Sequence, residues 1–549
     1  MKKLLSVLLA SSMVFTLAAC GGGSSTSTTA AATTAEAAAA TTAAAAETKA
    51  AESVPENVVI QEETQAGTGS MAGKTDLIFA LASETGSMDP GAYNVNWSNT
   101  VYMQVYESLL REDPQDRTVI IPELADSYEF IDDGNTLRFH IRQGVKFHDG
   151  TPLTADDVEY SLNRAMEKPA NASLASMMKD AVKVDDETVD LHLEYPFKPI
   201  LNIIAYPTFG IVCKEWYESG QHDVNIEANG TGPYTFVKWN RGDSIVLKAN
   251  ENWWKGEVPI KDLTYKFLTD GTSAAIALEN GDVQAYLGIS SADLARMREN
   301  PEINCASAKS SGFYYVAYNT REGSPFADKA VRQAMQYAID ADECLQGGMD
   351  GMGWTVTCMA PIGAAMYQED FEPHRGDLEK AKQILADAGY TEPIKATFKV
   401  ASYDDYLMTG QVIQEEAREA GIELEFQQME ETALITDVFD NHDFDCYLYW
   451  VGVQYPDIDS TYWRLFHSDS IKKDNTSDVD SVDDLLLQAR TSLDDDERYE
   501  LYRQITEKND EEVWYTPLFM STNTVCANAA LSGVYGHNAS LYHVSDWSY

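Results

Sequence analysis

The sequence predicts an α/β protein, in which strands and helices alternate along the chain. Apolar residues recur at helical spacing after Asp328 and after Asp377, as in amphipathic helices. Strand-like segments alternate with these helices at 312–319, 394–400 and 422–427. The alternation favours α/β architecture over an all-helical or all-strand fold.

The elements of the first half follow in order from Asp76. Residues 76–82 predict a strand, residues 101–110 carry apolar side chains at helical spacing, and residues 137–141 alternate as a strand does. Thr154, with Asp157 three residues later, forms a capping box and predicts the start of a helix. The apolar face of that helix consists of Val158, Leu162 and Met166.

Two further helices are predicted in the second half. Asp328 caps a helix whose inward face consists of Val331, Met335, Ala338 and Ile339. Asp377 begins another, which Gly389 closes and whose apolar residues are Ala381, Ile384, Leu385 and Ala388.

Length and charge narrow the possible functions. The part of the 549-residue chain that can bury a core starts near Asp76, and its length favours two or three domains. The chain has 40 Lys and Arg against 87 Asp and Glu, a formal net charge of −47. This charge argues against a nucleic-acid partner and against binding to an anionic membrane surface.

No catalytic, cofactor or metal motif is found. Six cysteines follow Cys20 without CxxC spacing, and their pairing is left open. HExxH and GxSxG are absent, and the His148-Asp149 pair in a turn is assigned no chemistry. We reject a phosphate loop at 73–75, because Thr68 stands where that motif needs glycine. The sequence therefore predicts no enzyme, no cofactor and no metal site.

The N-terminus predicts export. Lys2 and Lys3 precede an apolar run at 4–17, which is too short to span a bilayer, and small residues follow. The segment from Leu17 to Cys20 resembles the lipobox of bacterial lipoproteins, in which the cysteine receives a lipid before cleavage. We predict a signal peptide at 1–19 and a lipid anchor at Cys20, with palmitate among its acyl chains.

Residues 20–75 are predicted to be a tether. They are rich in Ser, Thr, Ala and Glu and contain few large apolar residues, so they cannot bury a core. As a flexible coil the segment reaches about 40 Å. The folded part is expected on the outer face of the cytoplasmic membrane, which is the periplasmic side where two membranes are present.

Several segments of the chain form a recognisable series. The longest is 137–165, which reads LRFHIRQGVKFHDGTPLTADDVEYSLNRA, and the others are 88–90, 105–109, 122–125, 230–234, 252–254, 318–319, 325–326, 331–334 and 378–390. In content and order these segments resemble the extracytoplasmic solute-binding proteins of ABC importers, in the family of oligopeptide-, dipeptide- and nickel-binding proteins. The block 137–165 is the most specific of them.

The resemblance implies a two-lobed fold of the periplasmic-binding-protein type, class II, with a small domain inserted in lobe one. Lobe one is expected at 76–110, 190–310 and 520–549, the inserted domain at 111–189 and lobe two at 311–519. Chain crossings between the lobes are then expected at 310–312 and 515–517, where Gly312 gives the first one backbone freedom.

The implied function is capture of a small solute by closure of the lobes and delivery to an ABC permease. Short peptides are the leading ligand class, and sugars, metal chelates and other solutes stay open. The ATPase is expected on a separate chain, and the protein is expected to be a monomer. Two alternatives of another class are a secreted glycosidase with paired carboxylates and a surface adhesin or receptor.

The resemblance also implies three segments around the ligand. The predicted ligand residues are Tyr93, Asn94, Asn96 and Trp97 in the first segment, Tyr314 and Tyr315 in the second, and Trp450, Gly452, Gln454, Tyr455 and Asp457 in the third. Peptide-binding members commonly carry an aspartate at the place of Gln454. Either Asp457 binds the ligand's ammonium group instead, or the ligand has no such group.

Overall fold

The computed structural model describes residues 73–113, 119–468, 470 and 482–549. The predicted signal peptide at 1–19, Cys20 and all but the last three residues of the predicted tether lie outside these ranges. Within the described ranges, no helix combines the length and the apolar character that crossing a membrane requires.

The largest sheet collects strands from distant parts of the chain. Seven of its strands follow the order β12-β19-β11-β1-β10-β9-β8, and β14 pairs with β19. The strands are β1 (Asp76–Leu81), β8 (Tyr234–Asn240), β9 (Ser244–Ala249), β10 (Asp262–Phe267), β11 (Ala285–Leu287), β12 (Ile303–Lys309), β14 (Gly353–Thr355) and β19 (Phe519–Asn528). The predicted first strand is confirmed as β1, which pairs in parallel with both β10 and β11. Three helices accompany this part of the chain, α1 (Asn96–Val105), α5 (Gly271–Glu279) and α6 (Ser291–Arg298).

A disulfide joins two neighbouring strands of this sheet. Cys305 in β12 stands directly opposite Cys526 in β19, and the two sulfur atoms are bonded across 221 residues of sequence. The four other cysteines of the described chain are free and buried, at Cys213, Cys344, Cys358 and Cys446.

A four-stranded antiparallel sheet forms from the middle of the first half, in the order β4-β5-β7-β6. Its strands are β4 (Ala125–Ile131), β5 (Thr136–Ile141), β6 (Met178–Lys183) and β7 (Thr188–Leu193). Helix α2 (Ala155–Met166) packs on β6, and its capping box between Thr154 and Asp157 is confirmed. Nearby are a small two-stranded sheet and two short helices, β2 (Leu110–Glu112), β3 (Ile120–Pro122), α3 (Ile200–Ile204) and α4 (Lys214–Glu218).

A five-stranded sheet carries the second half, in the order β16-β15-β17-β13-β18. The strands are β13 (Gly312–Tyr318), β15 (Ile394–Ala401), β16 (Ile422–Met429), β17 (Cys446–Gly452) and β18 (Tyr515–Pro517). The three predicted strands of this region are thus confirmed as β13, β15 and β16. Strand β15 pairs in parallel with β16 and β17, whereas β13 is antiparallel to both of its neighbours.

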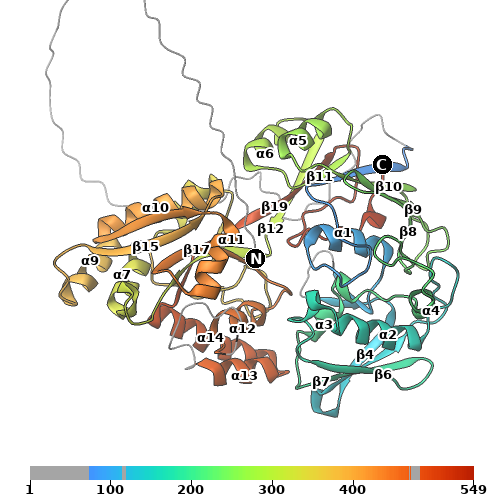
Figure 1. The fold of residues 1–549 in the computed structure, drawn as a ribbon, viewed down its shortest axis with the longest axis horizontal. Coiled ribbons are helices and arrows are strands. Elements are labelled where there is room, and N and C mark those ends of the chain that lie inside the picture. Colours follow the sequence, from blue (N-terminus) through green and yellow to red (C-terminus); the bar gives the residue numbers. More distant parts are fainter. Residues whose placement is uncertain (1–72, 114–118, 469, 471–481) are drawn as a thin grey trace, which may run out of the picture. The chain divides into compact units, whose positions relative to one another are not determined.

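Helices surround this sheet, and Figure 1 shows α7, α9 and α10 gathered around β15. The helices are α7 (Lys329–Ala338), α8 (Ala341–Met349), α9 (Leu378–Asp387), α10 (Asp404–Ala420), α11 (Glu431–Ile435), α12 (Asp459–Phe466), α13 (Asp483–Thr491) and α14 (Asp495–Glu512). The predicted caps are confirmed, because Asp328 accepts a hydrogen bond at the start of α7 and Asp377 does so at the start of α9.

The chain passes directly from the eight-stranded sheet to the five-stranded sheet between Lys309 and Gly312, at the predicted crossing 310–312. It passes back between Pro517 and Phe519, just after the predicted crossing 515–517, whose residues form β18. The sequence does not predict β14, which follows a helix of the second half yet pairs with β19. Arg375 links the residue after β14 to the last residue of β18, because its guanidinium donates hydrogen bonds to the carbonyls of Val356 and Pro517 at 2.9 and 3.1 Å.

The prediction of a helix at 101–110 is wrong in its bounds. Helix α1 ends at Val105, and the chain continues with an extended backbone at Tyr106. The backbone there bonds to other segments instead of continuing the helix. The carbonyl of Val105 accepts from Gly232, and the carbonyl of Glu107 accepts from Ile211, each at 2.9 Å. Tertiary pairing therefore overrides the helical spacing.

Candidate functional site

The first predicted ligand segment leads into α1. Tyr93 is 49% exposed, Asn96 is exposed and Asn94 is partly exposed. The side-chain oxygen of Asn94 accepts a hydrogen bond from buried Asn99 at 3.2 Å, which fixes the amide against the helix. Trp97 packs against the core of the eight-stranded sheet. The segment thus offers an aromatic ring and amides on a supported backbone.

The structure brings Tyr314, Trp450 and Gly452 together on β13 and β17. Tyr314 stands directly opposite Trp450, and Gly312 stands opposite Gly452. The indole of Trp450 covers both glycines, because a Cβ added to either would lie within 2.8 Å of a ring atom. The backbone N–H of Trp450 donates to the hydroxyl of Tyr406 at 3.1 Å. The partly exposed indole is therefore held flat on the strand pair, beside the passage between the sheets.

Tyr315 points to the other face of β13, because successive side chains alternate across a strand. It is 1% exposed, and its ring packs edge-on against the rings of Tyr447 and Tyr515. Tyr314 is also buried, and its hydroxyl donates to Asp405. These contacts show both tyrosines packed within the described part of the second half.

The loop after β17 contacts residues near the four-stranded sheet. Gln454 accepts a hydrogen bond from the Ser173 hydroxyl at 3.1 Å, and its backbone N–H donates to Ser460. Tyr455 is 4% exposed, and its ring packs edge-on against Phe197 at 6.2 Å between centroids. Both predicted ligand residues are thus in contact with side chains from the first half of the chain.

Asp457 already has a charged partner inside the protein. Both of its oxygens accept from Arg498, at 2.9 and 2.8 Å, and both side chains are almost fully buried. Burial raises the pKa of Asp457 although Arg498 acts to lower it. A second buried pair lies beside it, in which Arg490 donates to Asp459 at 3.0 and 2.7 Å. The two pairs hold the loop after β17.

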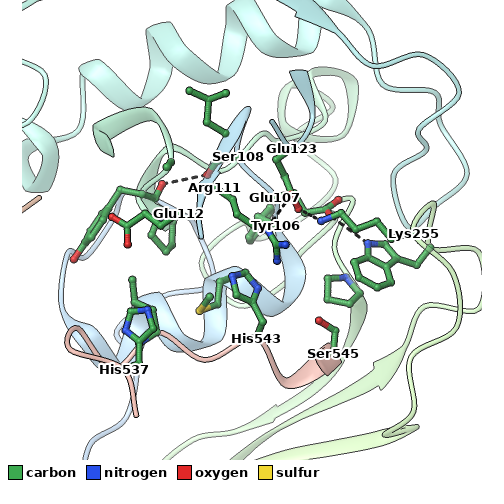
Figure 2. Close-up of a pocket in the computed structure, with 18 residues that line it drawn as sticks. Tyr106, Glu107, Ser108, Arg111, Glu112, Glu123, Lys255, His537, His543 and Ser545 are labelled. Atoms are coloured by element: carbon green, nitrogen blue, oxygen red, sulfur yellow. Dashed lines mark hydrogen bonds and ion pairs between the residues drawn. The ribbon is translucent and has the colours of Figure 1, made fainter. Parts of the chain in front are cut away.

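The described residues also enclose a small cavity of about 60 Å³, shown in Figure 2. Its wall, all from the described part of the chain, includes none of the predicted ligand residues. Two buried carboxylates face one lysine there, since Lys255 pairs with Glu123 and lies 3.4 Å from Glu107. The indoles of Trp253 and Trp254 donate to Glu107 at 3.2 and 2.9 Å. Sequence reasoning missed this cluster, although Glu107 lies in the family-like segment 105–109.

Burial raises the pKa of Glu107 to about 7, and the neighbouring Glu123 adds to the shift while Lys255 opposes it. The folded protein therefore binds this proton more tightly than the unfolded chain does. The resulting stabilisation is complete below the ordinary glutamate pKa and is lost as pH rises through about 7. His543, on the same cavity, stays neutral in that window, because burial lowers its pKa to about 3.

We expect the Glu107→Gln variant to lose less stability than the unchanged protein when the pH rises from 5 to 8. The amide keeps the shape of the protonated acid, so the variant lacks the cost of burying a charge at high pH. Its melting temperature at pH 8 should exceed that of the unchanged protein by roughly 2–4 °C, and thermal unfolding across this pH range measures it.

The matched control is Glu392→Gln, which replaces an exposed glutamate. This control should follow the unchanged protein at every pH. Because burial also raises the pKa of Glu416, to about 8, only the difference between each variant and the unchanged protein is informative. A Glu107→Gln curve parallel to that of the unchanged protein would contradict the prediction.

Across the described ranges, no group of three or more His, Cys, Asp or Glu side chains is placed to hold a metal ion.

The fold is that of the two-lobed periplasmic binding proteins. A solved structure of the oligopeptide-binding protein AppA from Bacillus subtilis, in complex with a nonapeptide, matches with a TM-score of 0.67. The two chains are 25% identical, and the match covers 86% of this chain and 98% of the other.

The sequence places the chain within that class. The profile described as bacterial extracellular solute-binding proteins, family 5 middle, matches residues 119–473. The chain belongs to this family, a solute-binding transport family of the extracytoplasmic space.

Two curated relatives have related sequences. Heme-binding protein A of Haemophilus influenzae is 31% identical over 55% of this chain and 59% of its own length. The glutathione-binding protein GsiB of Salmonella typhi is 28% identical over 59% of this chain and 63% of its own length. The chain thus spans about six tenths of the length of the curated relatives it matches.

Proposed function

We propose that this protein captures a small solute outside the cytoplasmic membrane and delivers it to the permease of an ABC importer. The observation that carries the proposal is the Trp450 indole, laid across Gly312 and Gly452 beside the passage between the two sheets. A flat, partly exposed ring at this position offers a large apolar contact with little conformational freedom to lose.

We propose short peptides as the leading ligand class. The names of the related proteins include an oligopeptide-binding and a glutathione-binding protein, which supports this choice, and also a heme-binding protein. Amide side chains at Asn94 and Asn96 would suit the peptide groups of such a ligand, because they both donate and accept hydrogen bonds.

We further propose that the protein is a monomeric lipoprotein. A lipid on Cys20 would hold it at the membrane, and the tether at 20–75 would let the folded part reach the permease. The permease and the ATPase would be separate chains, and the protein itself would catalyse no reaction. The signal-like residues before Cys20 support this arrangement.

Thermal unfolding with pooled ligands tests the proposal. A pool of short peptides is expected to raise the melting temperature, because a ligand that binds only the folded state stabilises it by mass action. Pools of sugars, metal chelates and heme serve as the competing classes. N-acetylated copies of the peptides should bind nearly as well, since Gln454 is neutral and Asp457 is paired with Arg498.

Replacing the indole links the binding to the site. Trp450→Ala should weaken binding of the active pool at least tenfold, the loss expected for a central aromatic contact. The control is Trp216→Ala, which removes a similarly half-buried indole that stacks on His222. Stabilisation by no pool, or equal binding by both variants, would overturn the proposal.

A further inference from the structure

The end of α13 and the start of α14, in the second half of the chain, contact the segment that follows β7. Asp495, the first residue of α14, pairs with Lys198 at 2.5 Å. Arg490, near the end of α13, donates to the Tyr195 hydroxyl at 3.4 Å, and its guanidinium lies 5.3 Å from the ring of Phe197. An ion pair, a hydrogen bond and a cation–π contact therefore join the same two segments.

The loop after β17 extends this contact. Its Gln454 side chain bonds to Ser173, and Tyr455 packs edge-on against Phe197. Tyr455 is buried in the apolar cluster of the four-stranded sheet. The strand that precedes it in the chain, β17, belongs to the five-stranded sheet. The contact thus has an apolar centre as well as a polar rim.

A close approach at Gly134 shows how tightly the surfaces meet. A Cβ on this glycine would lie 2.8 Å from the side chain of Leu493, which stands between α13 and α14. Gly134 also has a φ of +88°, a backbone conformation that other residues rarely adopt. Leu493 can therefore approach the backbone here because no side chain intervenes.

The buried ion pairs Arg490–Asp459 and Arg498–Asp457 support this contact from inside the second half. Asp459 binds the guanidinium of Arg490 and accepts from the hydroxyls of Tyr455 and Tyr502, at 2.7 and 2.9 Å. Two of the contacting side chains, Arg490 and Tyr455, are thus fixed to one carboxylate. They meet the first half of the chain as one preformed surface.

We propose that these contacts form a closure latch that favours the closed arrangement of the two lobes even without ligand. None of the latch residues lies at the passages between the sheets near 310 and 518, so rotation about those passages must break the latch. The latch then sets the fraction of closed protein, and the apparent dissociation constant changes with that fraction. The statement that closure captures a solute rests on the proposed function. The latch itself can be tested without a known ligand.

Distances between spin labels in the ligand-free, full-length protein test the latch. Labels on Lys179→Cys and Lys382→Cys report on the two halves, and both native side chains are about half exposed. The latch variant combines Lys198→Glu with Leu493→Asp. The first change places an acidic group opposite Asp495, and the second removes the apolar contact at Gly134. We expect its distance distribution to shift to longer values.

Two further variants make the result specific. The exchange Lys198→Glu with Asp495→Lys restores the ion pair in reverse and should keep the original distances. Lys395→Glu breaks an exposed pair with Glu423 between β15 and β16 and should also leave the distances unchanged. Because these substitutions are at or near the surface, circular dichroism should show the fold retained in all of them.

Unchanged distances in the latch variant would overturn the proposal, as would an equal shift in the Lys395→Glu control. Once a binding pool is known, the latch variant should bind it several-fold more weakly than the unchanged protein. If no pool binds while the distances still shift, the proposed function fails and the latch stands. These two outcomes are therefore distinguishable.

Discussion

Replacing Arg498 with alanine is expected to lower the free energy of unfolding by about 3–5 kcal/mol. The guanidinium is 1% exposed, and it donates to both oxygens of Asp457 and to the carbonyl of Ala489. Without it, the Asp457 carboxylate stays buried beside Asp459 with no cation of its own. Urea unfolding followed by tryptophan fluorescence measures the loss.

Two comparisons separate this effect from the loss of any arginine. Arg418→Ala removes a side chain that is 60% exposed and pairs with Glu415 on the surface of α10, so it should cause no measurable loss. Combining Arg498→Met with Asp457→Leu should recover much of the stability, since no unpaired charge is then buried. Equal stability of Arg498→Ala and Arg418→Ala would show that the buried pair is not needed.

Replacing Cys20 with alanine is expected to abolish lipid attachment in the producing cell. The thiol of this residue is the proposed acceptor of the lipid, and no hydroxyl or methyl group can take its place. Labelling with radioactive palmitate and separation of membranes from the soluble fraction measure the change. The variant should carry no label and should be recovered as unprocessed precursor or as released protein.

A nearby substitution serves as the control for the anchor. Ser25→Ala changes the same segment five residues later and should leave both labelling and membrane recovery intact. Membrane-bound, labelled Cys20→Ala protein would refute the anchor and with it the tethered arrangement.

Local signals in the sequence predicted much of the fold. The caps at Thr154, Asp328 and Asp377 depend on side chains that reach their own backbone within three residues. The strands at β13 and β15 follow from short apolar or alternating runs, which need no knowledge of their partners. The order of family-like segments correctly indicated the family and its two-lobed fold.

The candidate site was predictable only in part. The sequence placed Trp450 and Tyr314 on strands but could not show that they stand opposite each other. Nor could it show that Tyr455 packs against Phe197, more than 250 residues away in sequence. Pairing across such distances depends on sheet register, which side-chain periodicity alone does not determine.

By itself, the sequence determined the family, the α/β class and the elements with local caps, and it predicts an export-type N-terminus. The tertiary structure decided the Cys305–Cys526 disulfide, the end of α1 at Val105 and the pairing of Asp457 with Arg498. Each of these depends on which distant groups meet in the folded chain. A carboxylate looks the same in sequence whether it faces a ligand or an arginine, and only burial with a defined partner distinguishes the two.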